Sequence, residues 1–546
     1  MNRVFACFLG VLAGGIVAAA EPSPLIRLDT IGYLPAHEKK ATIAAPSTDF
    51  TVVRVADGTT VFSGRVSGPV TNPDTAEDVF IADFSALRDP GTYHLEINGV
   101  GVSDPFQIAS DVYRDAFRTV VRGFYLWRCG CAVRGEYHGD VFAHDACHTA
   151  DAWTDYITGE HQSLDATGGW HDAGDYNKYV VNAGVTVGAM FRAWEDFAPS
   201  IRRVPLDLPE AGGPLPELLA ELKWETDWLL KMQAPDGSVY HKVTTLRFGP
   251  FVLPEQEKEP RFFSPWGSPA TADFVAMLAA AARNLRPYDA GYADRCLAAA
   301  EKSYAFLQDH PNLQRPDLTQ FHTGGYGTED SDDRLWAAAE MWETTGAAAA
   351  LQDFETRLRT LQPTWDENFD WASVKDLGLL TYLGSKRPGR DAALVGELGD
   401  ALRATADAIV AKRNAHGYAR PLGSVYYWGG NGGVARQTLI LQAANRLSPN
   451  PDYIETALDA VHHLFGRNVH GRSYVTGLGA RPPLFPHDRR AGGDNVTNPW
   501  PGYLVGGPHP QAIDWHDEQK DARTNEIAIN WNAALVYALA GFLPAE

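Results

Sequence analysis

The sequence predicts a mainly α-helical domain, arranged as a helical toroid or barrel, that follows a small β-sandwich of immunoglobulin type. Short β-rich runs separated by turn signals occupy residues 24–108, which is the pattern of a small all-β module. After Ser110, long segments carry apolar residues at helical spacing, which predicts packed amphipathic helices. No flexible linker separates the two parts, so we expect a packed, fixed interface between them.

The β module is assigned to residues 22–108 and contains about seven strand-like runs, as a sandwich of this type requires. Asp57-Gly58 and Asn98-Gly99 are dipeptides that form hairpin turns. The module has no cluster of carboxylates, histidines or cysteines, so we expect a structural or accessory role. The clearest strand candidates are residues 26–28, 50–55, 79–84 and 92–97.

The helical domain is assigned to residues 109–546. Ser110 is expected to cap its first helix, because serine side chains accept hydrogen bonds from free N–H groups there. The loops between helices are long and rich in Gly, Pro, Trp and Asp, so we expect a site at the loop end of the barrel. The other predicted helices span residues 184–197, 215–232, 269–283, 292–308, 333–345, 348–361, 391–411, 434–447, 454–465 and 526–540.

The start of the chain predicts export. Residues 1–20 combine an early Arg, an apolar run and three alanines, as a cleavable signal peptide does; a short membrane anchor is the alternative. Beyond residue 20 no apolar run is long enough to span a bilayer. The net charge of −21 repels nucleic acid and anionic membranes, so neither is expected as a partner. The 15 Trp and 21 Tyr residues offer flat faces for sugar rings or for core packing.

Cysteines are few and unevenly placed. Cys129, Cys131 and Cys147 crowd into 19 residues, whereas Cys296 stands alone. In an exported protein a disulfide is the first expectation, but crowding beside histidines favours a metal site. The residues themselves leave both interpretations open.

Asp172 and Asp175 form the first cluster with chemistry. They are separated by Ala and Gly and flanked by Trp170, Tyr176 and Tyr179, so a Gly bend can direct both carboxylates into one walled cavity. Two carboxylates held that close cannot both ionise easily, which predicts a shifted pKa. A solvated turn is the alternative, since Asp and Gly are common turn residues.

Two further stretches lie near the C-terminus. Glu526 is expected in the first turn of a helix, where a glutamate would merely complement the dipole; a proton donor there would need burial to outweigh the dipole. Residues 473–489 end with His487 and Arg489 on an extended loop, where both can donate hydrogen bonds to hydroxyls. A salt-bridged surface loop is the alternative for that stretch.

Together these three stretches resemble glycoside hydrolase family 9, the inverting cellulases with an (α/α)6 barrel. The loop 473–489 and the stretch 515–533 match the two active-site signatures of the family, and residues 26–35 are similar to its immunoglobulin-like module. The resemblance covers nearly all of the mature chain. It departs at Ala522, where the family usually has an aromatic residue, which puts one pocket-wall contact in doubt.

The resemblance implies specific roles in single-displacement hydrolysis. Asp175 is expected to be the general base, Asp172 the residue that helps to position the water, and Glu526 the general acid. His487 and Arg489 are expected to bind substrate. Trp428, in a Tyr-Tyr-Trp-Gly-Gly stretch, is expected to stack on a sugar ring, with core packing as the alternative.

The resemblance also implies metals, although no catalytic cofactor. Cys129, Cys147 and His148 match a structural zinc site of relatives that carry the immunoglobulin-like module, and His171 is the expected fourth ligand. The competing interpretation is a disulfide from Cys147 to Cys129 or Cys131. Calcium is expected at the acidic run 328–333, through Asp332, Asp333 and Asp370, because calcium prefers oxygen ligands; a solvated acidic helix start is the alternative.

The predicted protein is therefore a secreted or periplasmic β-1,4-glucanase, expected as a monomer, that hydrolyses β-glucan or cello-oligosaccharides with inversion. An exo-acting enzyme that releases glucose, cellobiose or glucosamine is the alternative within the class. A non-catalytic carbohydrate-binding protein and a zinc hydrolase are hypotheses from other classes. No cellulose-binding module or dockerin-like repeat is evident after residue 540.

Overall fold

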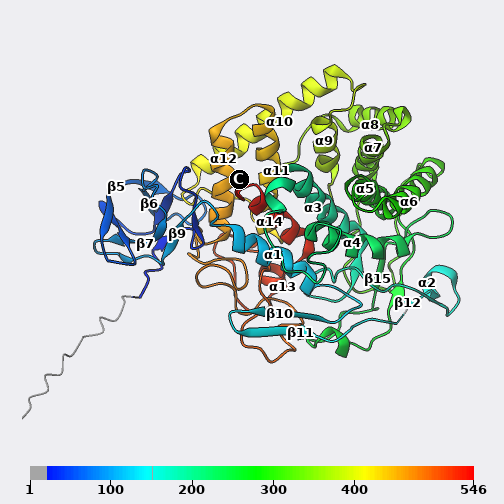
Figure 1. Ribbon diagram of the computed structural model, residues 1–546, viewed down its shortest axis with the longest axis horizontal. Helices are drawn as coiled ribbons and strands as arrows, with labels where there is room; N and C mark the ends of the chain where they lie inside the picture. The colour runs from blue at the N-terminus through cyan, green and yellow to red at the C-terminus, as the bar shows by residue number, and fades with distance from the viewer. Residues whose placement is uncertain (1–20, 151, 546) are drawn as a thin grey trace, which may run out of the picture.

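The computed structural model describes residues 21–150 and 152–545. The predicted signal peptide, residues 1–20, lies outside the described residues. Figure 1 shows a β-rich module, drawn in blue, beside a larger body of helices. No helix in the described ranges is both long enough and apolar enough to cross a membrane.

The β module is a two-layered sheet structure linked by one long strand, β5 (Thr60–Thr71). The first half of β5 pairs with β4 and its second half with β6, with a register shift between Ser67 and Val70. The buried side chains of both layers, among them Tyr93, Leu95 and Phe106, form one apolar core. The other strands are β1 (Ile26–Arg27), β2 (Gly32–Tyr33), β3 (Lys40–Ile43), β4 (Asp49–Arg54), β6 (Asp78–Asp83), β7 (Gly91–Ile97), β8 (Gly101–Val102) and β9 (Phe106–Ile108).

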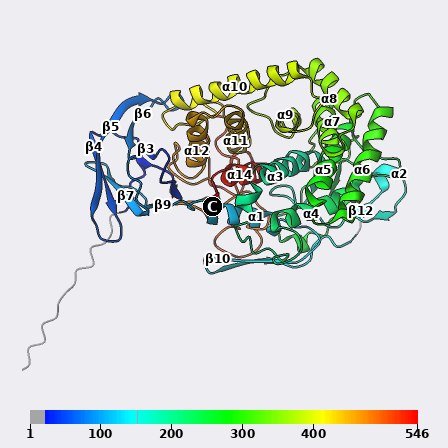
Figure 2. The same cartoon turned by 45° about the horizontal axis from the view of Figure 1, so that its top comes forward.

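The larger body contains twelve helices of ten residues or more within the described ranges. Helices α14, α3, α5, α7 and α9 pack side by side in that order, and α11 packs against α14, which forms an inner ring. Figures 1 and 2 show α6, α8 and α10 at the outer edge of the helical body. The inner helices are α3 (Val180–Ile201), α5 (Ser268–Leu285), α7 (Ser331–Thr345), α9 (Lys375–Gly384), α11 (Gly430–Leu447) and α14 (Ile529–Ala540); the outer ones are α1 (Arg114–Leu126), α4 (Glu217–Leu229), α6 (Ala290–Asp309), α8 (Ala348–Leu361), α10 (Ala392–Ala415) and α12 (Pro451–Leu464).

The predicted fold class, an α-helical barrel preceded by an immunoglobulin-like sandwich, is confirmed, but two local predictions are wrong and one helix was missed. Helix α1 begins at Arg114 with Tyr113 at its N-cap position, so Ser110 does not cap it. Helix α9 was not expected, because ten residues give little periodicity. Helix α14 begins at Ile529, so Glu526 precedes it in extended backbone.

Short elements gather at the loop end of the barrel. A five-stranded sheet joins β13, β12, β16, β15 and β14, and β14 leads directly into α3. These elements hold the long loops in place near the start of the inner helices. They are β10 (Val133–Tyr137), β11 (Asp140–His144), β12 (Ala152–Trp153), β13 (Ser163–Leu164), β14 (Lys178–Tyr179), β15 (Lys242–Thr244), β16 (Phe262–Phe263), the short helices α2 (Asp155–Thr158) and α13 (Ala522–Asn525), and the 3₁₀ turns Leu230–Met232 and Pro254–Gln256.

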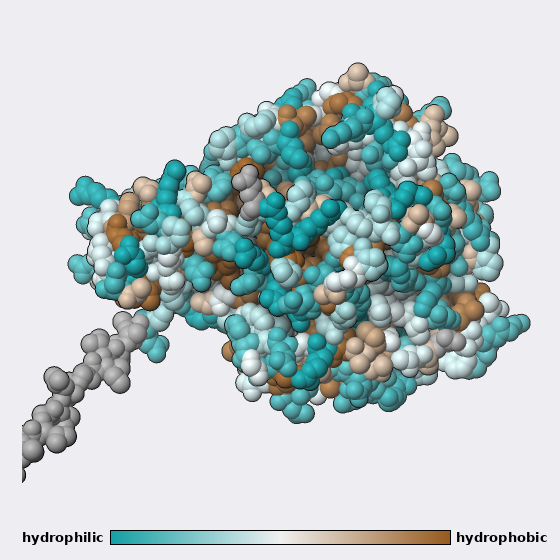
Figure 3. All heavy atoms as spheres, viewed as in Figure 1, coloured by the Kyte–Doolittle hydropathy of each residue, from teal (hydrophilic) through white to brown (hydrophobic). Residues whose placement is uncertain are grey.

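The two modules are joined by polar contacts that are largely buried. The Tyr113 hydroxyl donates to Asp29 Oδ2 at 3.1 Å, and Arg481 donates to Asp104 Oδ2 at 2.6 Å. Such directional hydrogen bonds hold the β module and the helical body in one relative orientation. This agrees with the fixed interface expected from the absence of a flexible linker. Further contacts are Arg413–Glu38, His37–Glu455 and Thr42–Gly417. Figure 3 shows that hydrophilic residues cover most of the face it displays, with hydrophobic residues in small groups.

Candidate active site

The Asp172–Asp175 bend lies deep in the protein. Asp172 and Asp175 are only 1% and 5% exposed, so the solvated-turn interpretation is wrong. A backbone N–H of the bend, that of Asp172, donates to the Asn177 carbonyl at 3.1 Å, which closes the turn. Gly174 is required here because a Cβ atom would lie 2.0 Å from the carbonyl oxygen of His487. The bend and the His487 loop are therefore pressed directly together.

Both carboxylate oxygens of Asp172 are occupied. Oδ1 accepts from Asn182 Nδ2 at 2.6 Å and Oδ2 accepts from the Tyr326 hydroxyl at 2.7 Å. Asn182 lies on α3, whereas Tyr326 comes from the loop before α7. Asp172 is thus held in one orientation by two separate elements.

Asp175 is held through one oxygen. Oδ2 accepts from Asn177 Nδ2 at 2.6 Å and from the Tyr179 hydroxyl at 2.9 Å. Among the described residues no side chain or backbone group donates to Oδ1, and Asp175 lines a cavity. One carboxylate oxygen therefore stays available to a molecule in that cavity.

The charged and polar surroundings of Asp172 and Asp175 affect their two pKa values differently. Burial, followed by the charge of Asp175, raises the pKa of Asp172 to about 8. Burial also raises the pKa of Asp175, but Arg489 and the two donors to Asp175 oppose that rise. Since two close carboxylates ionise in turn, the negative charge of the pair is favoured on Asp175.

Glu526 faces the same cavity from the other C-terminal stretch. It pairs with His487 in a short parallel bridge, and its carbonyl accepts from Gly506 N at 2.8 Å. Because the residue stands outside the helix, the expected dipole effect does not decide its pKa. Burial and then the charges of Asp175 and Asp172 raise the pKa of Glu526 well above its usual range. This shift favours the protonated form of the glutamate, which is the form that a general acid needs.

His487 and Arg489 also line the cavity, which contradicts the surface-loop interpretation. His487 Nδ1 lies 2.7 Å from the Gln519 carbonyl, so its other ring nitrogen is left for the cavity. Arg489 Nη1 donates to the Gly174 carbonyl at 2.8 Å and Nε donates to the Gly249 carbonyl at 3.0 Å. Arg489 therefore anchors the Asp172–Asp175 bend, a task that was not predicted from the sequence.

The cavity has a volume of about 610 Å³, within the range of small-molecule sites. Trp428 lies at its wall and is 48% exposed, so core packing is excluded for this side chain. Ala522 lines the cavity as well, at the position where an aromatic residue was expected. The remaining lining residues are Ala173, Tyr179, Phe248, Gly324, Gly325, Tyr326, Asp370, Trp371, Ala528, Asn530 and Trp531.

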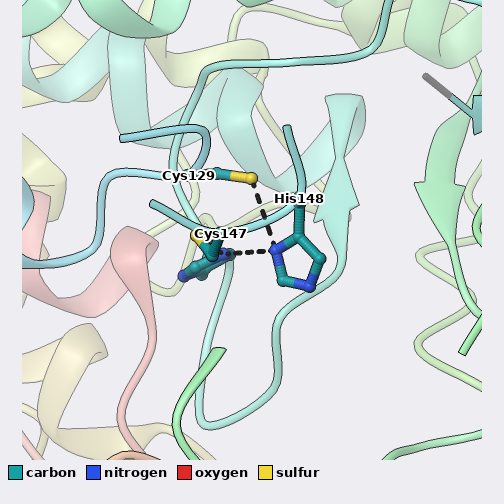
Figure 4. A group of neighbouring side chains, drawn as sticks. Cys129, Cys147 and His148 are labelled. Carbon is teal, nitrogen blue, oxygen red and sulfur yellow. Dashed lines mark hydrogen bonds between the residues drawn. The ribbon is translucent and has the colours of Figure 1, made fainter. Parts of the chain in front are cut away.

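The predicted zinc ligands come together. One ligand atom from each of Cys129, Cys147, His148 and His171 lies within 4.8 Å of all the others, and Figure 4 shows Cys129 and His148 directed toward one another. Cys147 Sγ lies 3.8 Å from His171 Nε2. All four cysteines in the described ranges are free, so the predicted disulfides do not form. Two thiols and two imidazoles that converge while buried match the donor set of a closed tetrahedral zinc site.

The three residues predicted to bind calcium each have a separate partner in the structure. Asp370 forms an ion pair with Arg436 and lines the cavity, whereas Asp332 Oδ2 accepts from Val374 N at 2.7 Å. Asp333 faces Asp273 inside the barrel. Within the described residues these carboxylates do not form a metal-binding group. Their residue types suited calcium, but their separate partners direct them apart.

Several site residues were missed by sequence reasoning. Tyr326 and Tyr179 supply donors to the two aspartates, and Trp371 and Asn530 line the cavity. Tyr326 follows two glycines in a loop, and conspicuous loop residues of that kind are a usual source of functional groups. Tyr179 was noted only as a possible wall residue, since its hydrogen bond cannot be read from spacing.

The comparisons with known proteins agree with the three motifs. Residues 113–539 match the model of glycosyl hydrolase family 9, and residues 21–102 match the cellulase N-terminal ig-like domain. Endoglucanase D of Acetivibrio thermocellus is 54% identical over 553 residues, which cover 99% of this chain and 85% of that protein.

Two solved structures show the same fold over nearly the whole chain. A metagenome-derived family 9 endoglucanase superposes with a TM-score of 0.89 at 34% identity, covering 95% of this chain and 98% of the other. A zinc-binding triple mutant of the family 9 endoglucanase J30 superposes with a TM-score of 0.88 at 31% identity, covering 94% of this chain and 100% of the other. The resemblance drawn from the motifs is confirmed: the chain belongs to glycosyl hydrolase family 9 and is a glycoside hydrolase.

Proposed function

We propose that this protein is an endo-β-1,4-glucanase that cleaves cellulose-type chains by single displacement with inversion. The observation that carries the proposal is that a buried carboxylate pair and a third carboxyl group, Glu526, whose pKa burial raises, line one cavity. Inverting glycosidases need such a base and acid, separated by roughly 6.5–9.5 Å so that a water fits between the base and the sugar.

Asp175 is the proposed base. Its free oxygen accepts a proton from the attacking water, while Asn177 and Tyr179 hold the other oxygen. Asp172, fixed by two donors, positions that water from the neighbouring side. Glu526 gives its proton to the departing glycosidic oxygen, and its raised pKa keeps that proton available.

Binding of the chain is assigned to the cavity walls. Trp428 offers an exposed aromatic face on which a pyranose ring can stack. The free ring nitrogen of His487 and the unengaged guanidinium nitrogen of Arg489 face hydroxyl groups of the sugar. An endo action is favoured over the exo alternative, because relatives as similar as 54% are endoglucanases by name. A purely carbohydrate-binding protein is disfavoured, because both Asp175 and Glu526 are present and oriented into the cavity.

A structural zinc ion is proposed at Cys129, Cys147, His148 and His171. Four protein ligands fill a tetrahedral shell and leave no position for a reacting water, which argues against a zinc hydrolase. The backbone N–H of His171 donates to the Trp127 carbonyl at 2.9 Å. His171 directly precedes Asp172 in the sequence. When bound, the metal would tie the segment around residue 129 to the catalytic bend, acting on the rate through geometry alone.

Four further proposals concern export, the module boundaries, the oligomeric state and the substrate class. The apolar start of the chain supports export after cleavage near residue 20. The β module is proposed to span residues 22–108 and the helical domain residues 109–546. The protein is proposed to act as a monomer. Its substrate class is cellulose or a related β-glucan, as the family implies.

The test compares wild type with Asp175→Asn and Glu526→Gln on soluble cellulose derivatives and cello-oligosaccharides. Each variant should lose at least about 100-fold in kcat, as the removal of a general acid or base does. Asp400→Asn and Glu259→Gln, both on the surface, serve as matched controls with wild-type rates. NMR of the newly formed anomer should show inversion, and viscosity should fall early relative to new reducing ends. Full activity of Asp175→Asn would refute the assignment of the base.

A further inference from the structure

A buried carboxylate outside the catalytic group lies beside the predicted metal ligands. Glu257 directly follows the 3₁₀ turn Pro254–Gln256, and its side chain is only 4% exposed. Its Oε2 atom lies 3.3 Å from His148 Nε2, and the His148 side chain is 6% exposed. A buried carboxylate needs a polar partner, and among the described residues the His148 imidazole lies within ion-pair distance of it.

The two nitrogens of His148 face different groups. Nδ1 lies 3.7 Å from Cys129 Sγ and 3.3 Å from His171 Nε2, so this nitrogen points into the ligand group. Nε2 points away from that group, toward Glu257. A neutral imidazole that ligates through Nδ1 carries its proton on Nε2. Within the described residues His148 Nε2 and Glu257 Oε2 are both buried without a hydrogen-bond partner and lie 3.3 Å apart, so each is within reach of the other.

The backbone at His148 also needs support. Its φ angle is +45°, in the left-handed region that non-glycine residues rarely adopt. Such a conformation persists only where its surroundings hold it. The side chain is held on one face by the ligand group and on the other by Glu257.

We propose that Glu257 is a positioning residue that fixes the tautomer and ring orientation of His148 for metal binding. This rests on the zinc site proposed above and adds to it a residue that touches no metal. Outer carboxylates of this kind raise the basicity of a histidine ligand and hold its ring in place.

Glu257 also connects the ligand group to the catalytic bend. A Cβ atom at Gly249 would lie 2.2 Å from Glu257 Oε1, so the carboxylate packs directly on that backbone. The Gly249 carbonyl accepts from Arg489 Nε, and Arg489 in turn donates to the Gly174 carbonyl. Glu257 therefore contacts both His148 and the Gly249 backbone to which Arg489, the anchor of the Asp172–Asp175 bend, is hydrogen-bonded.

The experiment measures metal binding by the full mature chain. Metal-free wild type, Glu257→Ala and Glu257→Gln are titrated with Zn²⁺ against a chromophoric chelator, and with Co²⁺ while the absorption spectrum is recorded. The control is Glu259→Ala, an exposed glutamate two residues further along. Wild type and control should bind one ion with the bands of a tetrahedral, two-thiolate cobalt site. Glu257→Ala should bind about 10- to 100-fold more weakly, with shifted bands. Glu257→Gln should fall between, because its amide oxygen accepts the proton without the charge.

Wild-type affinity and spectrum in Glu257→Ala would overturn the proposal. If that variant fails to fold by circular dichroism, Gly249→Ala replaces it, because the added methyl group displaces the carboxylate without removing it. Gly249→Ala should weaken metal binding in the same direction, and unchanged affinity there would equally refute the role. If wild type itself binds no metal, the zinc site and the role of Glu257 both fail, whereas wild-type hydrolysis of cello-oligosaccharides tests the glucanase proposal separately.

Discussion

Tyr179→Phe tests whether Asp175, rather than Asp172, carries the negative charge of the pair. The substitution removes one hydroxyl, which donates to Asp175 Oδ2 at 2.9 Å and accepts from Gly324 N at 3.1 Å. The ring is 2% exposed, and Phe fills nearly the same volume. Asn177 keeps its own hydrogen bond to the same oxygen, at 2.6 Å, so Asp175 remains in place.

The magnitude follows from the lost donor. A hydrogen bond to a charged group contributes about 1.5–3 kcal/mol, and one pKa unit corresponds to about 1.4 kcal/mol. The donor stabilises the ionised carboxylate, so its loss should raise the pKa of Asp175 by about 1–2 units. The base must be ionised to act, so the acid limb of the kcat/KM profile should move to higher pH by about the same amount. The plateau rate should change little.

The assay is the pH dependence of kcat/KM on a soluble cello-oligosaccharide. Tyr304→Phe is a matched control, because its hydroxyl donates to Asp353 Oδ2 at 2.7 Å away from the cavity. This control should keep the wild-type profile. An acid limb that stays in place in folded Tyr179→Phe would refute the argument that this donor sets the charge on Asp175.

Four further predictions follow from other contacts. Arg489→Lys loses the fork that holds two backbone carbonyls, so kcat should fall about 10- to 100-fold; an effect confined to KM would contradict the anchoring role. Trp428→Ala should raise KM about tenfold with little change in kcat, since stacking contributes about 1–1.5 kcal/mol; an unchanged KM on long oligosaccharides would argue against the platform. Burial alone would raise the pKa of Asp459, but Arg467 and Arg413 hold it below its usual range, so its stabilising effect is present above about pH 4 and is lost as the pH falls further. Asp459→Asn should therefore cost about 3–5 kcal/mol in urea unfolding at pH 7 and less at low pH; equal stability at pH 7 would contradict this. Chelation should lower Tm and abolish activity slowly, with both recovered on adding Zn²⁺, whereas immediate loss of activity at constant Tm would contradict a purely structural metal.

Much of the site could be predicted because its residues lie in short stretches of unusual composition. Asp172 and Asp175 stand three apart in one bend, and Cys147, one of the proposed zinc ligands, directly precedes His148. Long helices were predictable because apolar periodicity over many turns reports a buried face.

The parts that were not predicted depend on contacts between distant residues. Tyr326 meets Asp172 across 154 positions of sequence, and no local pattern encodes that meeting. Asp370 was assigned to calcium from its residue type, whereas in the structure this loop residue pairs with Arg436 of α11. The start of α14 was misplaced because Glu526 pairs with His487 in a bridge that overrides its helical propensity.

The contact between Arg481 and Asp104 has a practical consequence for engineering the enzyme. Arg481 belongs to the same loop as His487 and Arg489, so the β module holds one end of the segment that shapes the cavity. Deleting that module would leave Tyr113 and Arg481 without their partners at a newly exposed surface. A truncated barrel with low activity would then report a loosened active-site loop, and the loss could not be credited to substrate recognition by the module. Swapping the module between family members should succeed only when both sides of this contact are exchanged together.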